Sequence, residues 1–555
     1  MGPAPAPKGK DLAGREPLKV AHIVVIVAGG VLLASLSAYS ALWFDESYSV
    51  ALVRHPLGEL WRIASSDVHP PLYYYLLKLV WLLFPDDVVA YRLFSVAALG
   101  CLSLLGYTHL RRDFGGRVGI AFSFLTLVSP WSFRVSSQIR MYSWAALFVG
   151  VCLIYGLRVI RALREARLGE VAPTLPRHWW VVLCLSSAAA ANCHYFALMA
   201  AFSVNLCVIV ALVCARRCLR DTHVVRDYVL TAALACASFA PWMGALLGQA
   251  GHVSQYFWIR LDLPRALLQI VCFPFLDSDM ASIDAVVMSG LTESLTLVGS
   301  LAFVAVVVTA AALGPRAGRR AGGEKPGKED ACSGDARGHS GLTGWASQVL
   351  THPLTVCLIV YLLPLCLALL AGLIMNRPIL YVRYFYVGLA GLVLAVSLVL
   401  ARAGRPLLYG AAAAIAVLLT AQTMAFWLPR YHSPQNAAAN EFLESIPDGA
   451  LVSSDCEVGT LVTGAAGVRA ILAGYSDSTR VAYEAYEPSL TLCDTLDEAF
   501  VDGPDELWYL ETPTTLFKVG DVAQWFGYRV QGSTSLYRPI SSKEYVFYKL
   551  EKVAR

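Results

Sequence analysis

Charged residues are scarce in this chain of 555 residues. Asp, Glu, Lys and Arg together make up 15% of it, against about 25% in an average soluble domain. Hydrophobic residues make up 57%, more than soluble cores can hide, so a wholly soluble protein is excluded. At about 20 apolar residues per spanning helix, roughly ten spans would still leave several hundred residues for loops and a domain.

The chain also lacks a strong excess of charge of one sign. Its 44 basic and 40 acidic residues leave a formal net charge of +4, so nucleic acid is not expected as a partner. Paired cysteines of the CxxC kind are absent. Most of the 14 cysteines lie in apolar runs, where they behave as small hydrophobic side chains.

Clusters of Lys and Arg should mark the cytoplasmic side of the membrane. The apolar run at 71–84 is too short to span, and a crossing there would invert every later cluster, so we expect an interfacial helix on the outer face. Eleven spans then remain, and an odd number places the C-terminus outside. The predicted spans are 20–43, 88–110, 117–133, 141–160, 178–193, 196–215, 227–247, 290–313, 351–374, 384–401 and 406–426.

The predicted organisation starts with a cytoplasmic tail at 1–19 and a polytopic α-helical membrane domain at 20–426. Inside the membrane domain, the first outer loop covers 44–87. The loop at 314–344 is Gly-rich and charged, with little apolar surface to offset the entropy of ordering. We expect it to be disordered on the cytoplasmic side.

The remaining residues, 427–555, have normal polarity and predict an extracytoplasmic α/β domain. Short strand-like runs alternate there with helical stretches. Cys456 and Cys493 could form a disulfide in an oxidising compartment or remain two thiols, and the sequence leaves both open. The strand-like runs lie at 450–455, 506–510 and 545–550.

Two acidic sites lie at the outer membrane surface in this topology. Asp45 and Glu46 follow the first span, and Asp67 lies just before Pro70 and Pro71. Carboxylates so close to hydrocarbon are costly unless they are hydrated, paired or used in chemistry. The alternative is structural: Asp45 caps a helix starting at Glu46, and Asp67 caps the helix that the prolines begin.

Further polar side chains lie in separate loops on the same outer side. Arginines on the outer side of the membrane go against the positive-inside bias. A single one would be explained by a side chain that snorkels to lipid headgroups. Four arginines in separate outer loops favour an anion site instead. The guanidinium fork matches phosphate oxygens. The four arginines are Arg140, Arg260, Arg377 and Arg383.

A series of outer motifs then appears in a recognisable order. It runs FDE, DVHPPLYYYLL, SQIRMYSW, HYF, PW and RPILYVRY. This order resembles the bacterial polyprenyl-phosphate-sugar glycosyltransferases of the C-type membrane fold, which are related to protein O-mannosyltransferases and to the aminoarabinose transferase of lipid A. The likeness covers roughly 20–400. This chain has HPPLYY where protein O-mannosyltransferases typically have HPPLGK, and it lacks their β-trefoil insertion, so the acceptor stays open.

The resemblance implies an integral protein of a bacterial plasma membrane that transfers a sugar from a polyprenyl-phosphate donor on the outer face. Asp45 matches the family's catalytic carboxylate, and Glu46 and Asp67 belong to the same acidic cluster. Arginines of the later outer loops would bind the lipid-linked phosphate. The expected substrate-binding and phosphate-binding residues are His69, Arg140, Tyr142, His194, Arg383 and Tyr384.

The chemistry suits these residue types. A carboxylate can accept the proton of an unidentified hydroxyl acceptor, and arginine can stabilise the departing phosphate. One carboxylate on the face opposite the phosphate predicts inversion. No cofactor is required, although Asp45, Asp67 and His69 could bind a divalent metal. The alternative function is a lipid-phosphate carrier or flippase, which makes no bond and needs no base.

Overall fold

The computed structural model describes residues 15–39, 41–169, 172–173, 175–220, 222–256, 298–312, 349–376, 379, 381–461, 467–472, 477–500 and 504–553. The predicted cytoplasmic loop at 314–344, most of the tail, Arg260 and Arg377 lie outside these residues. The side chain of Cys456 is likewise not described.

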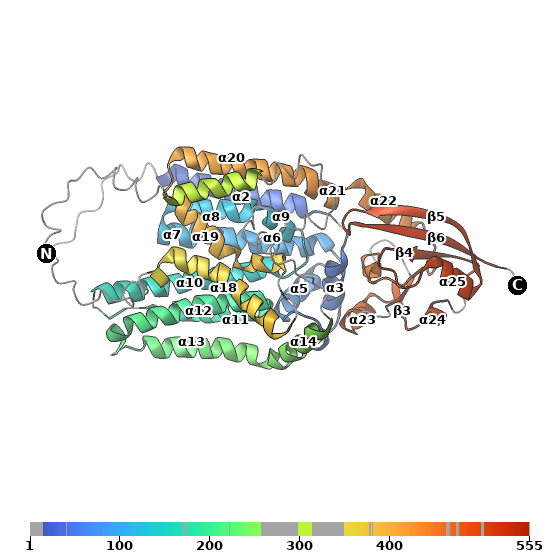
Figure 1. Ribbon diagram of the computed structural model, residues 1–555, viewed down its shortest axis with the longest axis horizontal. Helices are drawn as coiled ribbons and strands as arrows, with labels where there is room; N and C mark the ends of the chain where they lie inside the picture. The colour runs from blue at the N-terminus through green and yellow to red at the C-terminus, as the bar shows by residue number, and fades with distance from the viewer. Residues whose placement is uncertain are drawn as a thin grey trace.

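Helices running along the long axis of the molecule form the larger part, and a sheet-containing domain lies at one end (Figure 1). Seven helices are long and apolar enough to cross a membrane, which makes this an integral membrane protein; the count of eleven spans stays a prediction. The seven are Leu18–Ser37, Val88–Phe114, Tyr142–Gly169, Tyr195–Leu219, Val224–Gly251, Pro353–Ile374 and Arg383–Leu400.

Most predicted spans correspond closely to helices. The first helices are α2 (Arg15–Ser37), α3 (Phe44–Arg54), α4 (Leu57–Ser65), α5 (Leu72–Leu83), α6 (Val88–Leu105), α7 (Arg111–Phe114), α8 (Gly116–Val128), α9 (Pro130–Ser136) and α10 (Tyr142–Gly169). The later ones are α11 (Arg177–Cys193), α12 (Tyr195–Ala215), α13 (Val224–Phe239), α14 (Met243–Tyr256), Val298–Ala312, α18 (Pro353–Ile374), η7 (Val382–Gly388), α19 (Leu389–Leu400) and α20 (Arg405–Gln422).

Two predicted spans end or break earlier than expected. The first was predicted to continue to residue 43, but α2 ends at Ser37, because the Arg92 guanidinium holds the following segment by donating to the carbonyls of Tyr39 and Ala41. The third is broken between α8 and α9. Ser129 accepts a hydrogen bond from the Ser132 N–H, and Pro130 starts the new helix, as caps and N1 prolines do.

The predicted interfacial segment forms α5. Its 12 residues give a helix of about 18 Å, too short for the roughly 30 Å hydrocarbon core. It packs against α3, α6 and α11 at the end of the bundle that faces the sheet domain (Figure 1). This end holds the residues of the candidate site.

The C-terminal domain is built on a six-stranded sheet with the order β3-β2-β1-β4-β6-β5. The first four of these strands are parallel, and β6 and β5 complete the sheet in antiparallel fashion. All three predicted strand runs are confirmed, as β1, β4 and β6. The strands are β1 (Leu451–Ser453), β2 (Val468–Ile471), β3 (Leu490–Cys493), β4 (Glu506–Glu511), β5 (Tyr528–Arg538) and β6 (Lys543–Lys552).

Short helices complete the domain. They are α21 (Leu428–Tyr431), α22 (Pro434–Glu444), η9 (Cys456–Thr460), α23 (Asp477–Tyr483), η10 (Glu484–Tyr486), α24 (Leu496–Phe500) and α25 (Val519–Phe526). Cys493, at the end of β3, is a buried free thiol, and the partner proposed for it lies outside the described side chains.

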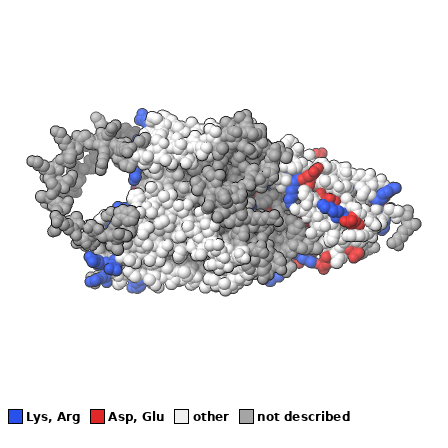
Figure 2. Space-filling view, viewed as in Figure 1, with Lys and Arg blue, Asp and Glu red and all other residues white. Residues whose placement is uncertain are grey.

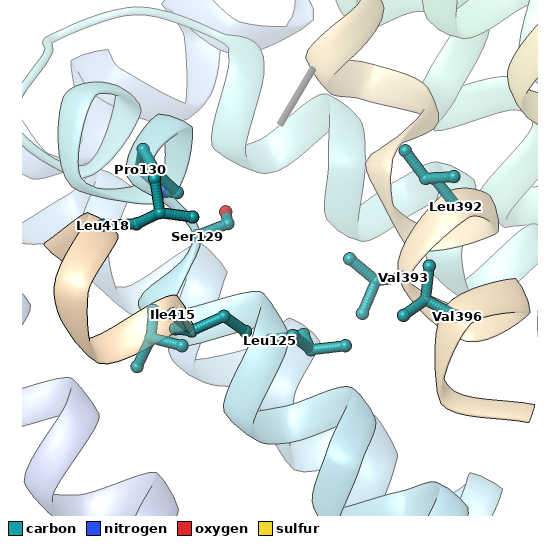
Figure 3. Close-up of a pocket in the computed structure, with 9 residues that line it drawn as sticks. Leu125, Ser129, Pro130, Leu392, Val393, Val396, Ile415 and Leu418 are labelled. Carbon is teal, nitrogen blue, oxygen red and sulfur yellow. The ribbon is translucent and has the colours of Figure 1, made fainter. Parts of the chain in front are cut away.

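The narrow gap between α8, α19 and α20 is a packing feature of the bundle. It holds about 10 Å³, room for one water at most. Figure 3 shows apolar side chains around it, including Leu125, Val393 and Ile415, with the Ser129 hydroxyl beside them. None of its lining residues is titratable, so it offers no acid, base or cation for catalysis.

Candidate active site

The first turn of α3 carries both predicted acids, Asp45 and Glu46. Trp43 is the N-cap residue of α3 and Pro71 that of α5, so neither Asp45 nor Asp67 occupies a capping position. The capping alternative is therefore wrong for both. Their side chains are free for other contacts.

Glu46 forms a fully buried ion pair with Arg92 of α6. The Arg92 Nη2 lies 2.7 Å from Oε2, and its Nε lies 3.2 Å from Oε1. The backbone N–H groups of Ile139 and Trp43 also donate to this carboxylate, at 3.0 and 3.3 Å. Burial raises the pKa of Glu46, and Arg92 opposes that rise. Because both oxygens already accept hydrogen bonds, the carboxylate has little capacity left for a substrate.

Asp45 has a different environment. Its Oδ2 lies 3.2 Å from Nη1 of Arg383, which comes from η7, and the two side chains are 18% and 11% exposed. Arg140 does not reach the carboxylate; its Nη1 donates to the Asp45 carbonyl and to the Ser49 hydroxyl, each at 3.3 Å. Within the described residues, Asp45 Oδ2 accepts no well-aligned hydrogen bond. This carboxylate is held in place but not saturated.

Asp67, near the start of the loop between α4 and α5, interacts electrostatically with Arg140 and Asp45. Burial raises its pKa to about 6, Arg140 opposes the rise, and Asp45 adds to it. A carboxyl group with a pKa near neutrality can hold or release a proton under physiological conditions. The structure thus brings Asp45, Asp67, Arg140 and Arg383 into one site.

Two histidines and two tyrosines form one wall of this site. The rings of His69 and His194 stack at 5.2 Å, and His194 lies 5.3 Å from Tyr384 and 5.5 Å from Tyr142. Burial, followed by Arg140, lowers the pKa of His69 and lowers that of His194 to about 3. Both imidazoles are therefore neutral at physiological pH.

The tautomer of His194 follows from its position as the N-cap of α12. Its Nδ1 accepts a hydrogen bond from the Phe196 N–H at 3.1 Å, so the proton of the neutral ring lies on Nε2. Among the described residues, this Nε2 has no partner, and neither have His69 Nδ1 and the Tyr142 hydroxyl. Buried polar atoms seldom remain unpaired, and several together indicate a place where a ligand binds.

An apolar cavity of about 210 Å³ adjoins this wall and shares His69, His194 and Tyr384 with it. The end of α18 and the face of α12 supply most of the apolar lining. The apolar residues around it include Phe196, Met199, Leu246, Ala371, Met375 and Ile379. The apolar cavity therefore lies beside the part of the site that contains Arg140 and Arg383.

The described residues contain no group of three or more His, Cys, Asp or Glu side chains that could hold a metal ion. Asp45, Asp67 and His69 thus do not make such a group.

Sequence reasoning missed Arg92, which fixes the loop before α3. The signal for it was present, because a charged residue inside a predicted span is costly and needs a partner. The expected site residues also included none of the tyrosines of HPPLYYY. The hydroxyl groups of Tyr73 and Tyr74 are buried without partners in the part of the chain that the structure describes.

The C-terminal domain is seated on α3, the helix that carries Asp45. The Tyr483 hydroxyl lies 2.8 Å from the Ser47 hydroxyl, and the Tyr486 hydroxyl donates to the Ser47 carbonyl at 2.5 Å. The His55 Nε2 lies 3.0 Å from the carbonyl of Ala482. These contacts join the two parts of the molecule next to the candidate site.

Residues 68–243 match the family model described as dolichyl-phosphate-mannose-protein mannosyltransferase. The predicted relationship to protein O-mannosyltransferases is confirmed over this segment. It includes His69, Arg140, Tyr142 and His194, whereas Asp45 and Arg383 lie outside it. No curated protein matches the chain.

The chain is also similar to solved structures. ArnT from Cupriavidus metallidurans in the apo state is 12% identical, with a TM-score of 0.42 over 95% of this chain and 98% of that chain. ArnT bound to undecaprenyl phosphate is 14% identical, with a TM-score of 0.41 over 95% and 97%. The Archaeoglobus fulgidus oligosaccharyltransferase in complex with Zn and sulfate is 11% identical, with a TM-score of 0.36 over 80% and 61%. TM-scores below 0.5 give these likenesses no weight for residue roles.

Proposed function

We propose that this protein is a membrane glycosyltransferase that moves a sugar from a polyprenyl-phosphate donor to a hydroxyl acceptor. The observation that carries the proposal is the unsaturated carboxylate of Asp45, with Arg383 and Arg140 beside it and an apolar cavity next to the same wall. The family match over 68–243 supports glycosyl transfer in general.

The donor would occupy both compartments. Part of its isoprenoid chain would lie in the apolar cavity, and its phosphate would lie against Arg383 and Arg140. The Nε groups of both guanidiniums are buried without partners among the described residues. When the donor phosphate accepts hydrogen bonds from the Arg383 guanidinium, that guanidinium would no longer pair with Asp45. Donor binding would therefore free the Asp45 carboxylate.

The transfer step follows from this placement. Asp45 would accept the proton of the acceptor hydroxyl while the oxygen of that hydroxyl attacks the anomeric carbon of the donor sugar. The bond from the anomeric carbon to the phosphate oxygen would break at the same time. The two guanidiniums would stabilise the departing phosphate. With a single carboxylate on the face opposite the leaving group, the product would have inverted configuration.

The other residues of the site would assist. The His194 Nε2–H and the Tyr142 hydroxyl would bind the sugar or the phosphate, and Asp67 would be the candidate base in place of Asp45 if Asp45 is not the base. Glu46 fits a positioning role better than the catalytic role expected from its sequence, because its oxygens already accept hydrogen bonds from Arg92 and two backbone N–H groups.

The site and the C-terminal domain would face the outside of a bacterial plasma membrane. Lys and Arg are visible without Asp or Glu at the opposite end of the helical bundle, whereas the C-terminal domain carries both acidic and basic side chains (Figure 2). Basic residues favour the cytoplasmic side. The basic end would therefore lie in the cytoplasm.

The decisive experiment compares Asp45→Asn with Asp87→Asn in purified, lipid-reconstituted protein. Asp87 is an N-cap at the start of α6, and Asn preserves such a cap, so this control should transfer sugar normally. Asp45→Asn should lose at least about 10²-fold in transfer rate, as removal of a general base does. Release of polyprenyl phosphate from labelled polyprenyl-phosphate sugars measures the rate.

A loss of less than about 10-fold, equivalent to roughly 1.4 kcal/mol, would remove Asp45 from the role of base. A lipid-phosphate carrier makes no bond, so its function would survive Asp45→Asn. Lipid movement without sugar transfer in the unmodified protein would favour that alternative.

A further inference from the structure

Another cavity, lined by apolar side chains together with two arginines and a histidine, lies at the end of the bundle away from the C-terminal domain, where α7 is found (Figure 1). It has a volume of about 220 Å³. Phe114 ends α7, Arg161 comes from α10, His352 precedes α18, and Arg402 follows α19. It is thus formed where the ends of α7, α18 and α19 meet beside α10, and it is separate from the site around Asp45.

Among the described residues, no acidic side chain pairs with the two arginines that line this cavity. Arg161 stacks over the Phe114 ring at 4.6 Å and uses one N–H on the Asp113 carbonyl. The Asp113 carboxylate is already paired with Arg158 at 2.7 Å. Across the described ranges, the Arg402 side chain has neither a hydrogen bond nor an ion pair. Two guanidiniums therefore line the cavity, and neither pairs with a carboxylate of the part of the chain that the structure describes.

His352 and the start of α18 add to the attraction for an anion. The His352 Nδ1 accepts a hydrogen bond from the Leu354 N–H at 3.3 Å, which leaves Nε2–H as a donor. Burial, Arg164 and Arg402 lower the pKa of His352, so the ring stays neutral. The first turn of this 22-residue helix adds the positive end of its dipole.

We propose that this cavity binds the phosphate group of an anionic phospholipid headgroup. The guanidiniums and the helix start supply the anion contacts, and Leu354, Leu398 and Val399 supply apolar surface for the adjoining lipid. Basic pockets between membrane helices are known to hold such headgroups. The bound lipid would connect α10 to the start of α18 and the end of α19. This inference does not depend on the proposed transferase activity.

The test uses the full-length protein, delipidated in detergent and titrated with phosphatidylglycerol, with bound lipid counted by native mass spectrometry. At the usual contribution of a basic residue near a membrane surface, Arg161→Ala combined with Arg402→Ala should weaken binding roughly 30-fold. The matched control is Arg217→Ala, an exposed arginine of η2 (Arg216–Leu219) that lines no described cavity. It should bind as the unmodified protein does.

Arg402 is exposed, so Arg402→Ala alone provides a variant that should fold normally and lose about fivefold. Equal binding of phosphatidylglycerol by the control and by both cavity variants would overturn the proposal. Equal binding of zwitterionic phosphatidylcholine would do the same. If millimolar inorganic phosphate displaces phosphatidylglycerol, the ligand is a free phosphate and the lipid assignment is wrong.

Discussion

Glu46 and Asp45 are neighbours in the chain, but they face two different regions of the molecule. Glu46 points into the bundle, where Arg92, Ile139 and Trp43 occupy its carboxylate oxygens. Asp45 points toward Arg383 and keeps one oxygen without a well-aligned hydrogen bond in the described structure. Successive residues of a helix lie about 100° apart around its axis. One turn of α3 can therefore direct Glu46 into a region where its hydrogen bonds are saturated and Asp45 into a site where they are not.

The contrast extends to the guanidiniums. Arg92 donates to Glu46 and to the carbonyls of Ser137, Tyr39 and Ala41. Arg383 and Arg140, in contrast, each keep a buried Nε without a partner in the part that is described. A buried donor without a partner costs about 1–3 kcal/mol. The saturated pair indicates a structural role, and the unsaturated groups indicate a place prepared for a ligand.

Arg92→Ala should produce the largest loss of stability, because it leaves Glu46 as a buried charge without its partner. We expect a loss of about 3–5 kcal/mol, measured as thermal unfolding in detergent. Arg226→Ala is the control, since its pair with Asp227 is exposed and worth at most about 1 kcal/mol. Glu46→Gln added to Arg92→Ala should recover part of the loss. Equal shifts of the unfolding temperature for Arg92→Ala and the control would mean that the Glu46–Arg92 pair does not stabilise the fold.

At the Asp45 site, Arg383→Ala should weaken the apparent donor affinity about 10-fold to 100-fold, as expected for a lost charge-assisted hydrogen bond. Arg383→Lys should restore only part of it, because an ammonium keeps the charge but loses the fork. Arg62→Ala, an exposed arginine of α4, should change nothing. Full rescue by Lys would mean that Arg383 contributes only its positive charge and no bidentate hydrogen bonding to donor binding.

Asp67 should make the stability of the protein depend on pH. The pKa of its carboxyl is raised by burial from 3.8 to about 6, so between these values the folded state binds more protons than the unfolded state. Stability should therefore fall as pH rises through this window. Thermal unfolding from pH 4 to 7 should show a smaller fall in Asp67→Asn. Parallel curves for the two proteins would contradict this assignment.

The smallest effect is expected at the seat of the C-terminal domain. Tyr483→Phe removes the contact with the Ser47 hydroxyl and should cost about 0.5–1.5 kcal/mol. If this contact helps to position α3, kcat should fall a few-fold with KM unchanged. Tyr537→Phe, in β5, is the control within the same domain. A normal kcat together with lowered stability would limit Tyr483 to holding the domain.

Patterns in the sequence predicted the helical membrane part, three strands of the C-terminal sheet and the loops that meet at the site. They could not distinguish Asp45 from Glu46, because the rotation of α3 that separates them depends on where the helix begins. That start, at Phe44, is fixed by Arg92, whose contacts with the loop exist only in three dimensions. The same contacts explain why α2 ends at Ser37 rather than near residue 43.

The Asp45–Arg383 contact has a consequence for biogenesis. Chains are made from the N-terminus, so the Glu46–Arg92 pair can close as soon as α6 has entered the membrane. Arg383 arrives only after α18 has been synthesised. If Arg383 binds the donor phosphate as proposed, the nascent protein therefore has α3 but no complete phosphate site during most of its synthesis. On the proposed function, the order of the chain would then keep an incompletely synthesised protein from binding a lipid donor.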